Sequence, residues 1–206
     1  MATGMFDKGD FQPLSTEFKR LGLVALRDLS KFQEQFGIYD TDTTINSIRD
    51  TIIADILGFD LVNQRKHGFD AKRSKTGEFL EVKQCSISAK RWGGTWNDTN
   101  VEKAKAFSSG RLYTVVAVWR GASDLQFVVF GKSKEVGEYL LDRVKHRKKG
   151  SRSTQNIPIE KLIKWGFIVV IPPGKSKEGV LKQLAVRSNT LSRLVTLGDI
   201  KTVKEL

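Results

Sequence analysis

The sequence has too few cysteine and histidine residues for a disulfide-stapled or zinc-finger protein. A single cysteine, Cys85, cannot form an intramolecular disulfide, and the 2 histidines do not complete a Cys/His zinc cluster with it. No apolar run approaches the roughly 18 residues of a membrane span. Charged residues also stand in 1–10, where a signal peptide would be apolar. We therefore expect an intracellular, cytoplasmic protein with no membrane partner.

What the sequence has in excess is positive charge. Its 206 residues include 35 lysine and arginine residues against 23 aspartate and glutamate residues, which leaves a formal net charge of +12. Hydrophobic residues make up 39% of the chain, enough for a packed core. A positive excess attracts polyanions, and nucleic acid is the commonest of them. Without repeats or a Pro/Ser-rich linker, the sequence indicates a single domain over 1–206.

Hydrophobic periodicity predicts a mixture of helices and strands. A first helix is expected at 14–36 and a second from Asp42 to Gly58, the latter with an apolar face made by Ile45, Ile48, Ile52 and Ile56. The other expected elements are strands at 59–64, 69–73, 78–86, 112–119, 125–130 and 167–171, helices at 101–107, 134–149 and 158–165, and a loop at 91–100. This order predicts an α/β (α+β) fold, a central mixed β-sheet flanked by helices. Its core would span about 41–172, followed by a helical tail at 176–206.

Charged side chains interrupt an apolar predicted hairpin. Glu81 and Lys83 share the parity of Phe79 along the second strand, so all three project to one face. Asp70, in the partner strand, is within reach of Glu81. Two carboxylates held together repel each other unless a cation binds between them, and such hard oxygen ligands suit Mg²⁺, for which Mn²⁺ can substitute. The alternative is a solvated cross-strand ion pair, but the apolar neighbours favour the metal site.

Asp70 followed eleven residues later by Glu81-Val82-Lys83 resembles the motif of the PD-(D/E)XK nuclease superfamily, the fold of many type II restriction endonucleases. The motif's usual proline is replaced by Phe69. The resemblance implies a restriction-endonuclease-like core at about 41–172. It also implies that Asp70, Glu81 and the Val82 carbonyl ligate Mg²⁺ and that Lys83 positions the attacking water.

The resemblance also suggests accessory groups and a function. Many members add an acid from the preceding helix, for which Asp50 and Asp55 are candidates, and a glutamine after the lysine, here Gln84, is frequent. The implied activity is Mg²⁺-dependent, sequence-specific hydrolysis of double-stranded DNA by a homodimer, encoded by a prokaryote or a phage. A structure-selective or homing nuclease of the same fold, similar to junction resolvases, and a non-catalytic DNA-binding module are the alternatives.

Two segments carry the side chains expected to contact DNA. The first combines cations, amides and aromatic rings around two glycines, and its candidates are Lys90, Arg91, Trp92, Trp96, Asn97 and Asp98. The alternative is a structured loop with both tryptophans in the core and Asp98 or Thr99 capping the next helix. The second is a basic run whose candidates are Lys145, Arg147, Lys148 and Lys149.

Overall fold

A computed structural model describes residues 16–37, 41–61, 69–145 and 153–206 of the protein. Contacts divide the chain into two units, Met1–Asn46 and Ser47–Leu206, and each is described by itself. The first contains helix α1 (Thr16–Phe36) and the start of helix α2 (Thr41–Ile56). In this unit the Gln33 amide donates a hydrogen bond to the Thr44 hydroxyl at 3.3 Å. The single domain expected from the sequence stays a prediction.

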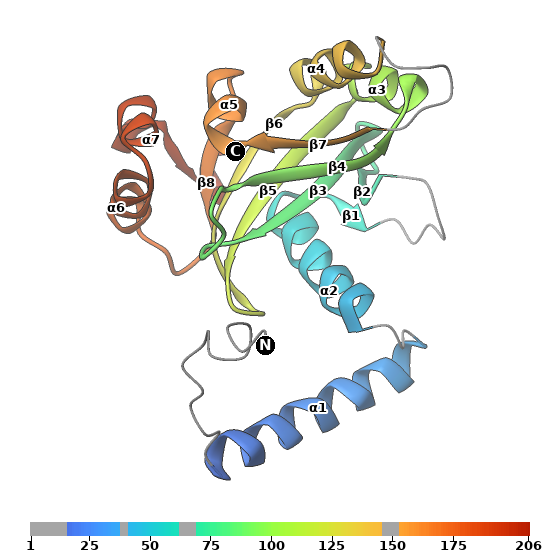
Figure 1. Ribbon diagram of the computed structural model, residues 1–206, viewed down its shortest axis with the longest axis vertical. Helices are drawn as coiled ribbons and strands as arrows, with labels where there is room; N and C mark the ends of the chain where they lie inside the picture. Colours follow the sequence, from blue (N-terminus) through green and yellow to red (C-terminus); the bar gives the residue numbers. More distant parts are fainter. Residues whose placement is uncertain (1–15, 38–40, 62–68, 146–152) are drawn as a thin grey trace, which may run out of the picture. The chain divides into compact units, whose positions relative to one another are not determined.

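A seven-stranded mixed sheet lies at the centre of the second unit, in the order β1-β2-β3-β5-β6-β8-β9 (Figure 1). The β3–β5 and β8–β9 pairs are parallel, and the other neighbouring strands are antiparallel. This confirms the predicted mixed sheet flanked by helices. The strands are β1 (Asp60–Leu61), β2 (Ala71–Arg73), β3 (Glu78–Ser86), β5 (Leu112–Arg120), β6 (Asp124–Lys132), β8 (Ile168–Ile171) and β9 (Ile200–Thr202).

Two hydrophobic clusters pack on opposite faces of this sheet. One cluster joins the sheet to five helices and to a separate two-stranded ribbon. These elements are α3 (Val101–Phe107), α4 (Lys134–Lys145), α5 (Ile159–Lys164), α6 (Lys177–Arg187), α7 (Asn189–Leu194), and the ribbon strands β4 (Gly93–Thr99) and β7 (Ser153–Pro158). The other cluster packs the C-terminal part of α2 against β2, β3, β5 and β6. Apolar residues on both faces of β5 explain its nearly continuous hydrophobic sequence.

The ribbon corrects the loop predicted at 91–100. Residues 93–99 form β4, which pairs antiparallel with β7, a strand that the sequence did not predict. Two glycines allow β4 to lie close to both β7 and β3. A Cβ added at Gly93 would collide with the Ile157 carbonyl of β7, and one added at Gly94 would lie 2.9 Å from the Lys83 Cβ of β3. The ribbon is thereby held directly against β3.

The buried face of α2 also differs from the prediction. Ile53, Ala54 and Leu57 are buried, whereas Ile52, expected to face inward, is 36% exposed. Ile56 of the predicted face does pack against the cluster that contains Ile53, Ala54 and Leu57, so the packed face is rotated away from Ile52 rather than replaced. The helix ends as predicted, near Gly58, whose φ is +69°.

The C-terminal segment is mostly helical, as expected, but it also supplies β9 to the sheet edge and two short 3₁₀ turns, η1 (Leu197–Asp199) and η2 (Val203–Glu205). Helix α4 ends at Lys145, and the rest of the helix predicted to residue 149 lies outside the described residues. None of the helices in the described part of the chain is long and apolar enough to cross a lipid bilayer.

Candidate active site

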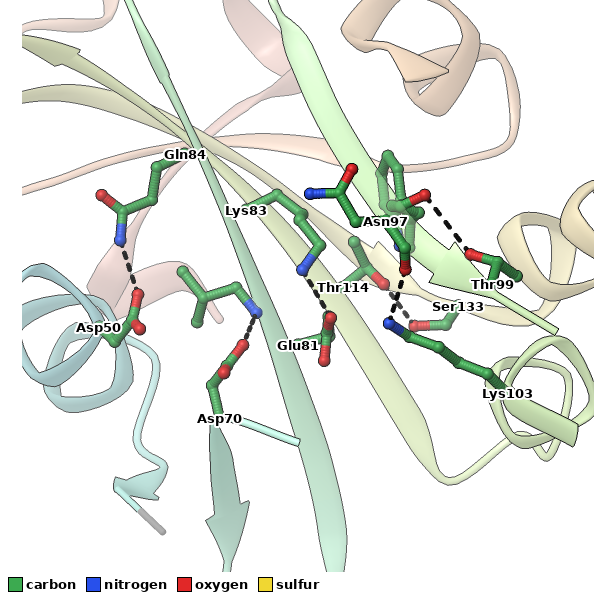
Figure 2. Close-up of polar contacts among 12 residues, drawn as sticks. Asp50, Asp70, Glu81, Lys83, Gln84, Asn97, Thr99, Lys103, Thr114 and Ser133 are labelled. Atoms are coloured by element: carbon green, nitrogen blue, oxygen red, sulfur yellow. Dashed lines mark hydrogen bonds and ion pairs between the residues drawn. The ribbon is translucent and has the colours of Figure 1, made fainter. Parts of the chain in front are cut away.

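The site begins where β2 and β3 separate. The predicted hairpin is confirmed: β2 pairs with β3 from Arg73–Glu78 to Ala71–Leu80. Beyond that pair, the Asp70 carboxylate Oδ2 accepts a hydrogen bond from the Val82 N–H at 2.6 Å, so a side chain takes the place of the next backbone partner (Figure 2). In an extended strand the N–H and C=O of one residue point to the same side. The Val82 carbonyl therefore faces the same edge of β3 as the Asp70 carboxylate.

Glu81 and Lys83 meet on one face of β3, as their parity predicts. The Lys83 Nζ lies 2.6 Å from the Glu81 Oε1 in an ion pair. Glu81 is only 5% exposed, although it is a carboxylate on a sheet that packs apolar groups on both faces. A solvated surface pair is therefore the wrong description. Burying an ion pair costs several kcal/mol of desolvation per ion, a large fraction of the roughly 5–15 kcal/mol by which a folded protein is stable.

The structure distinguishes between the two helical acids. The Asp50 Oδ1 accepts a hydrogen bond from the Gln84 Nε2 at 2.7 Å, and Asp50 interacts electrostatically with Lys83 and Glu81 (Figure 2). Asp55 is exposed on the same helix. Asp50, Asp70 and Glu81 therefore belong to one charged group, together with Gln84 and Lys83, and Asp55 does not join it.

Burial and mutual repulsion change how these acids ionise. Burial and, to a lesser extent, the neighbouring Glu81 charge raise the pKa of Asp70 to about 7, against the opposing effect of the Val82 hydrogen bond. Burial likewise raises the pKa of Asp50 to about 6. Burial lowers the pKa of the Lys83 ammonium, but the attraction of Glu81 outweighs this and holds that pKa above its usual value. At neutral pH the site has more carboxylate charge than Lys83 alone balances.

The donor set suits a small hard cation held by few protein ligands. No three His, Cys, Asp or Glu side chains come together as a metal-binding group in the described ranges. The Asp70 carboxylate and the Val82 carbonyl lie at the open edge of β3, and Glu81, on the adjoining face, interacts electrostatically with Asp70. Mg²⁺ commonly takes one or two carboxylates and keeps several waters, and it needs no larger cluster of side chains. An added positive charge would also offset the burial and the Glu81 repulsion that raise the pKa of Asp70.

Arg49 is a site residue that the sequence did not reveal. Its guanidinium donates to the Gly121 carbonyl at 2.7 Å and to the Ala122 carbonyl at 2.9 Å, both in the β5–β6 turn. It also donates to the Gln84 Oε1 at 3.4 Å and lies 5.0 Å from the Trp119 ring centre. Arg49 thus holds Gln84 from one side while Asp50 accepts its amide from the other.

We expect Arg49→Met to lower the free energy of unfolding by about 1–2 kcal/mol, because a partly exposed set of charge-assisted hydrogen bonds is lost while the apolar stem is kept. Urea denaturation followed by circular dichroism measures the change. Arg120→Met, at an exposed arginine at the end of β5, is the matched control and should change stability by less than about 0.5 kcal/mol. Equal losses in both variants would contradict the role assigned to Arg49.

The residues expected to contact DNA have separate environments. Trp92 and Trp96 are 4% and 0% exposed and belong to the hydrophobic core. For these two residues the core alternative is therefore correct. Lys90, Arg91, Asn97, Asp98 and Lys145 are exposed. Helix α3 is capped by neither Asp98 nor Thr99, but by Asn100, whose side chain accepts the Lys103 N–H at 2.8 Å. Arg147, Lys148 and Lys149 lie outside the described residues.

Comparison with known proteins adds no family assignment to this geometry: no protein-family model matches the sequence, and no curated protein is significantly similar to it.

Proposed function

We propose that the protein is a metal-dependent endonuclease that hydrolyses phosphodiester bonds of double-stranded DNA. The observation that carries the proposal is the convergence of Asp70, Glu81 and Lys83 at the point where β2 and β3 separate. A basic chain of net charge +12 supports a polyanionic substrate. The helix–hairpin setting of these residues is also that of the PD-(D/E)XK motif, which the sequence resembles.

The proposed roles follow from the contacts of each group. Asp70, Glu81 and the Val82 carbonyl would hold a Mg²⁺ or Mn²⁺ ion, which when bound polarises the phosphoryl oxygens and neutralises the charge that develops on them. Lys83 is anchored at one N–H by Glu81, and its ammonium has two further donors for a water molecule and a phosphate oxygen. Burial keeps these groups in a medium where charge interactions are stronger than in water.

Asp50 and Gln84 are placed to support the ligands in this proposal. The Gln84 amide fixes the Asp50 carboxylate, which interacts electrostatically with Lys83 and Glu81. Asp50 would accept hydrogen bonds from water on the bound cation and would keep Lys83 protonated. For cleavage of both strands at a short palindromic sequence, two such sites related by two-fold symmetry are needed, so we propose a homodimer that acts as a sequence-specific, restriction-type enzyme.

The direct test is cleavage of supercoiled plasmid, linear duplexes of varied sequence and a four-way junction, each with Mg²⁺, with Mn²⁺ and with EDTA. We expect sharp cuts at one short sequence, only with a divalent cation. Cuts at the branch point irrespective of sequence would instead indicate a structure-selective nuclease. Salt-sensitive DNA binding without hydrolysis under any of these conditions would indicate a binding module and would overturn the proposal.

A further inference from the structure

A cavity away from the carboxylates lies between α6 and the segment that follows β3. Its volume is about 560 Å³, within the usual range for small-molecule sites. Ile87 and Trp92 form one wall, and a face of α6 with Lys182, Gln183, Val186 and Arg187 forms the other. Together with Gly179, these helical residues recur along α6 at intervals of three to four positions, so they lie on one side of the helix.

The wall around Trp92 is fixed in place. The Trp92 indole N–H donates to the Ile87 carbonyl at 2.9 Å, and the ring packs edge-on against Phe127 at 5.5 Å between centres. The Arg187 guanidinium lies 5.0 Å from the centre of the Trp92 ring and donates to the Ala89 carbonyl. The planar Arg187 guanidinium therefore makes a cation–π contact with the Trp92 ring. A ligand that enters the cavity would contact this guanidinium without any rearrangement of the wall.

The lining selects for a ligand with both charge and an apolar surface. Lys182 and Arg187 are cationic, and none of the residues that line the cavity, all in the described part of the chain, is acidic. Ile87 is half-buried, and Val186, 84% exposed, leaves an apolar side chain in solvent at the rim. A guanidinium plane stacks well on nucleic-acid bases, and a lysine ammonium pairs with phosphate. One nucleotide carries both groups.

We propose that this cavity binds one nucleotide unit, with its base stacked on the Arg187–Trp92 wall and its phosphate on Lys182. The unit is either a residue of a bound DNA strand, turned out of the helix, or a free nucleotide. A strand residue is within range because Ile87 directly follows β3 and its N–H donates to the Trp119 carbonyl of β5 at 2.8 Å, next to the last paired residue of β3. At about 3.3 Å per residue, Ile87 lies about 13 Å from Lys83, or some four nucleotides along a duplex strand.

The experiment has one arm for each source of the nucleotide. In the first arm, 2-aminopurine is placed at successive positions of a duplex, and its fluorescence is read with the full-length protein in Ca²⁺ or EDTA, so that the DNA stays intact. A rise confined to one position indicates an unstacked base. In the second arm, free deoxynucleoside monophosphates are titrated by calorimetry, and saturable one-to-one binding indicates a free nucleotide. A positive result in either arm supports nucleotide binding in this cavity, and negative results in both arms overturn the proposal.

Substitutions in the cavity lining test whether the measured signal comes from this cavity. Arg187→Ala and Lys182→Glu should each lower the positive signal or affinity at least about ten-fold, because stacking or phosphate pairing is lost. Lys182 is exposed, so its variant tests the site even if Arg187→Ala disturbs the fold. Lys204→Glu, at another exposed lysine, controls for overall charge. An unchanged signal in both cavity variants would overturn the proposal. Cleavage measured on the same samples shows separately whether the proposed nuclease activity holds.

Discussion

Asp70→Asn, Glu81→Gln and Lys83→Ala will each lower the rate of DNA cleavage by about a thousand-fold. The first two each remove the negative charge of one proposed metal ligand, and the third removes the ammonium that would hold the water. Metal-borne charge stabilisation is worth several kcal/mol in a transition state, and about 4 kcal/mol corresponds to a thousand-fold in rate. Single-turnover cleavage of a labelled duplex measures the effect.

Asp55→Asn is the matched control for this prediction, since it neutralises an exposed acid on α2 without touching the buried group. It should cleave within about two-fold of the parent, because surface charges of this kind contribute little. DNA binding in EDTA should persist in all four variants, which separates lost chemistry from lost folding. Cleavage that survives Asp70→Asn or Glu81→Gln would remove those side chains from the metal site.

Local sequence signals were enough to predict the hairpin that carries the acids. Alternating apolar residues in 78–86 and the turn at Gly77, whose φ is +69°, specify strand, turn and register within a short segment. Parity then placed Glu81 and Lys83 on one face, and the eleven-residue spacing placed Asp70 opposite. Each of these inferences needed only neighbours along the chain.

The parts that the sequence could not predict depend on contacts between distant segments. Strand β4 has glycines and an exposed polar face, so it resembles a loop until its pairing with β7, about 60 residues later, is known. Asp50 and Asp55 differ by about 140° in helical phase, so choosing between them needs the buried face of α2, on which Ile52 was wrongly placed. Arg49 gains its role from a turn 72 residues away in sequence.

Without metal, the protein will lose stability as the pH rises from about 4 to about 7, and Asp70→Asn will abolish much of that loss. In the unfolded chain Asp70 ionises near its usual pKa of about 4, whereas burial raises its pKa to about 7 in the folded protein. Between these values the folded state binds a proton that the unfolded state has lost, so a rising pH favours unfolding. Above pH 7 the accumulated cost is on the order of 4 kcal/mol, because each pKa unit corresponds to about 1.4 kcal/mol.

An asparagine at position 70 stays neutral and keeps an oxygen for the Val82 N–H, so it avoids this cost. We expect Asp70→Asn in EDTA to match the parent near pH 4 and to be more stable than it by on the order of 4 kcal/mol at pH 8, as measured by urea denaturation. Millimolar Mg²⁺ should stabilise the parent at pH 8 and leave the stability of the variant unchanged. Only an ionised carboxylate at position 70 attracts the cation strongly enough to offset the free energy of removing its water. A variant less stable than the parent at pH 8 would mean that Asp70 is paired with a cation of the protein itself, and that the site needs no metal to hold its charge.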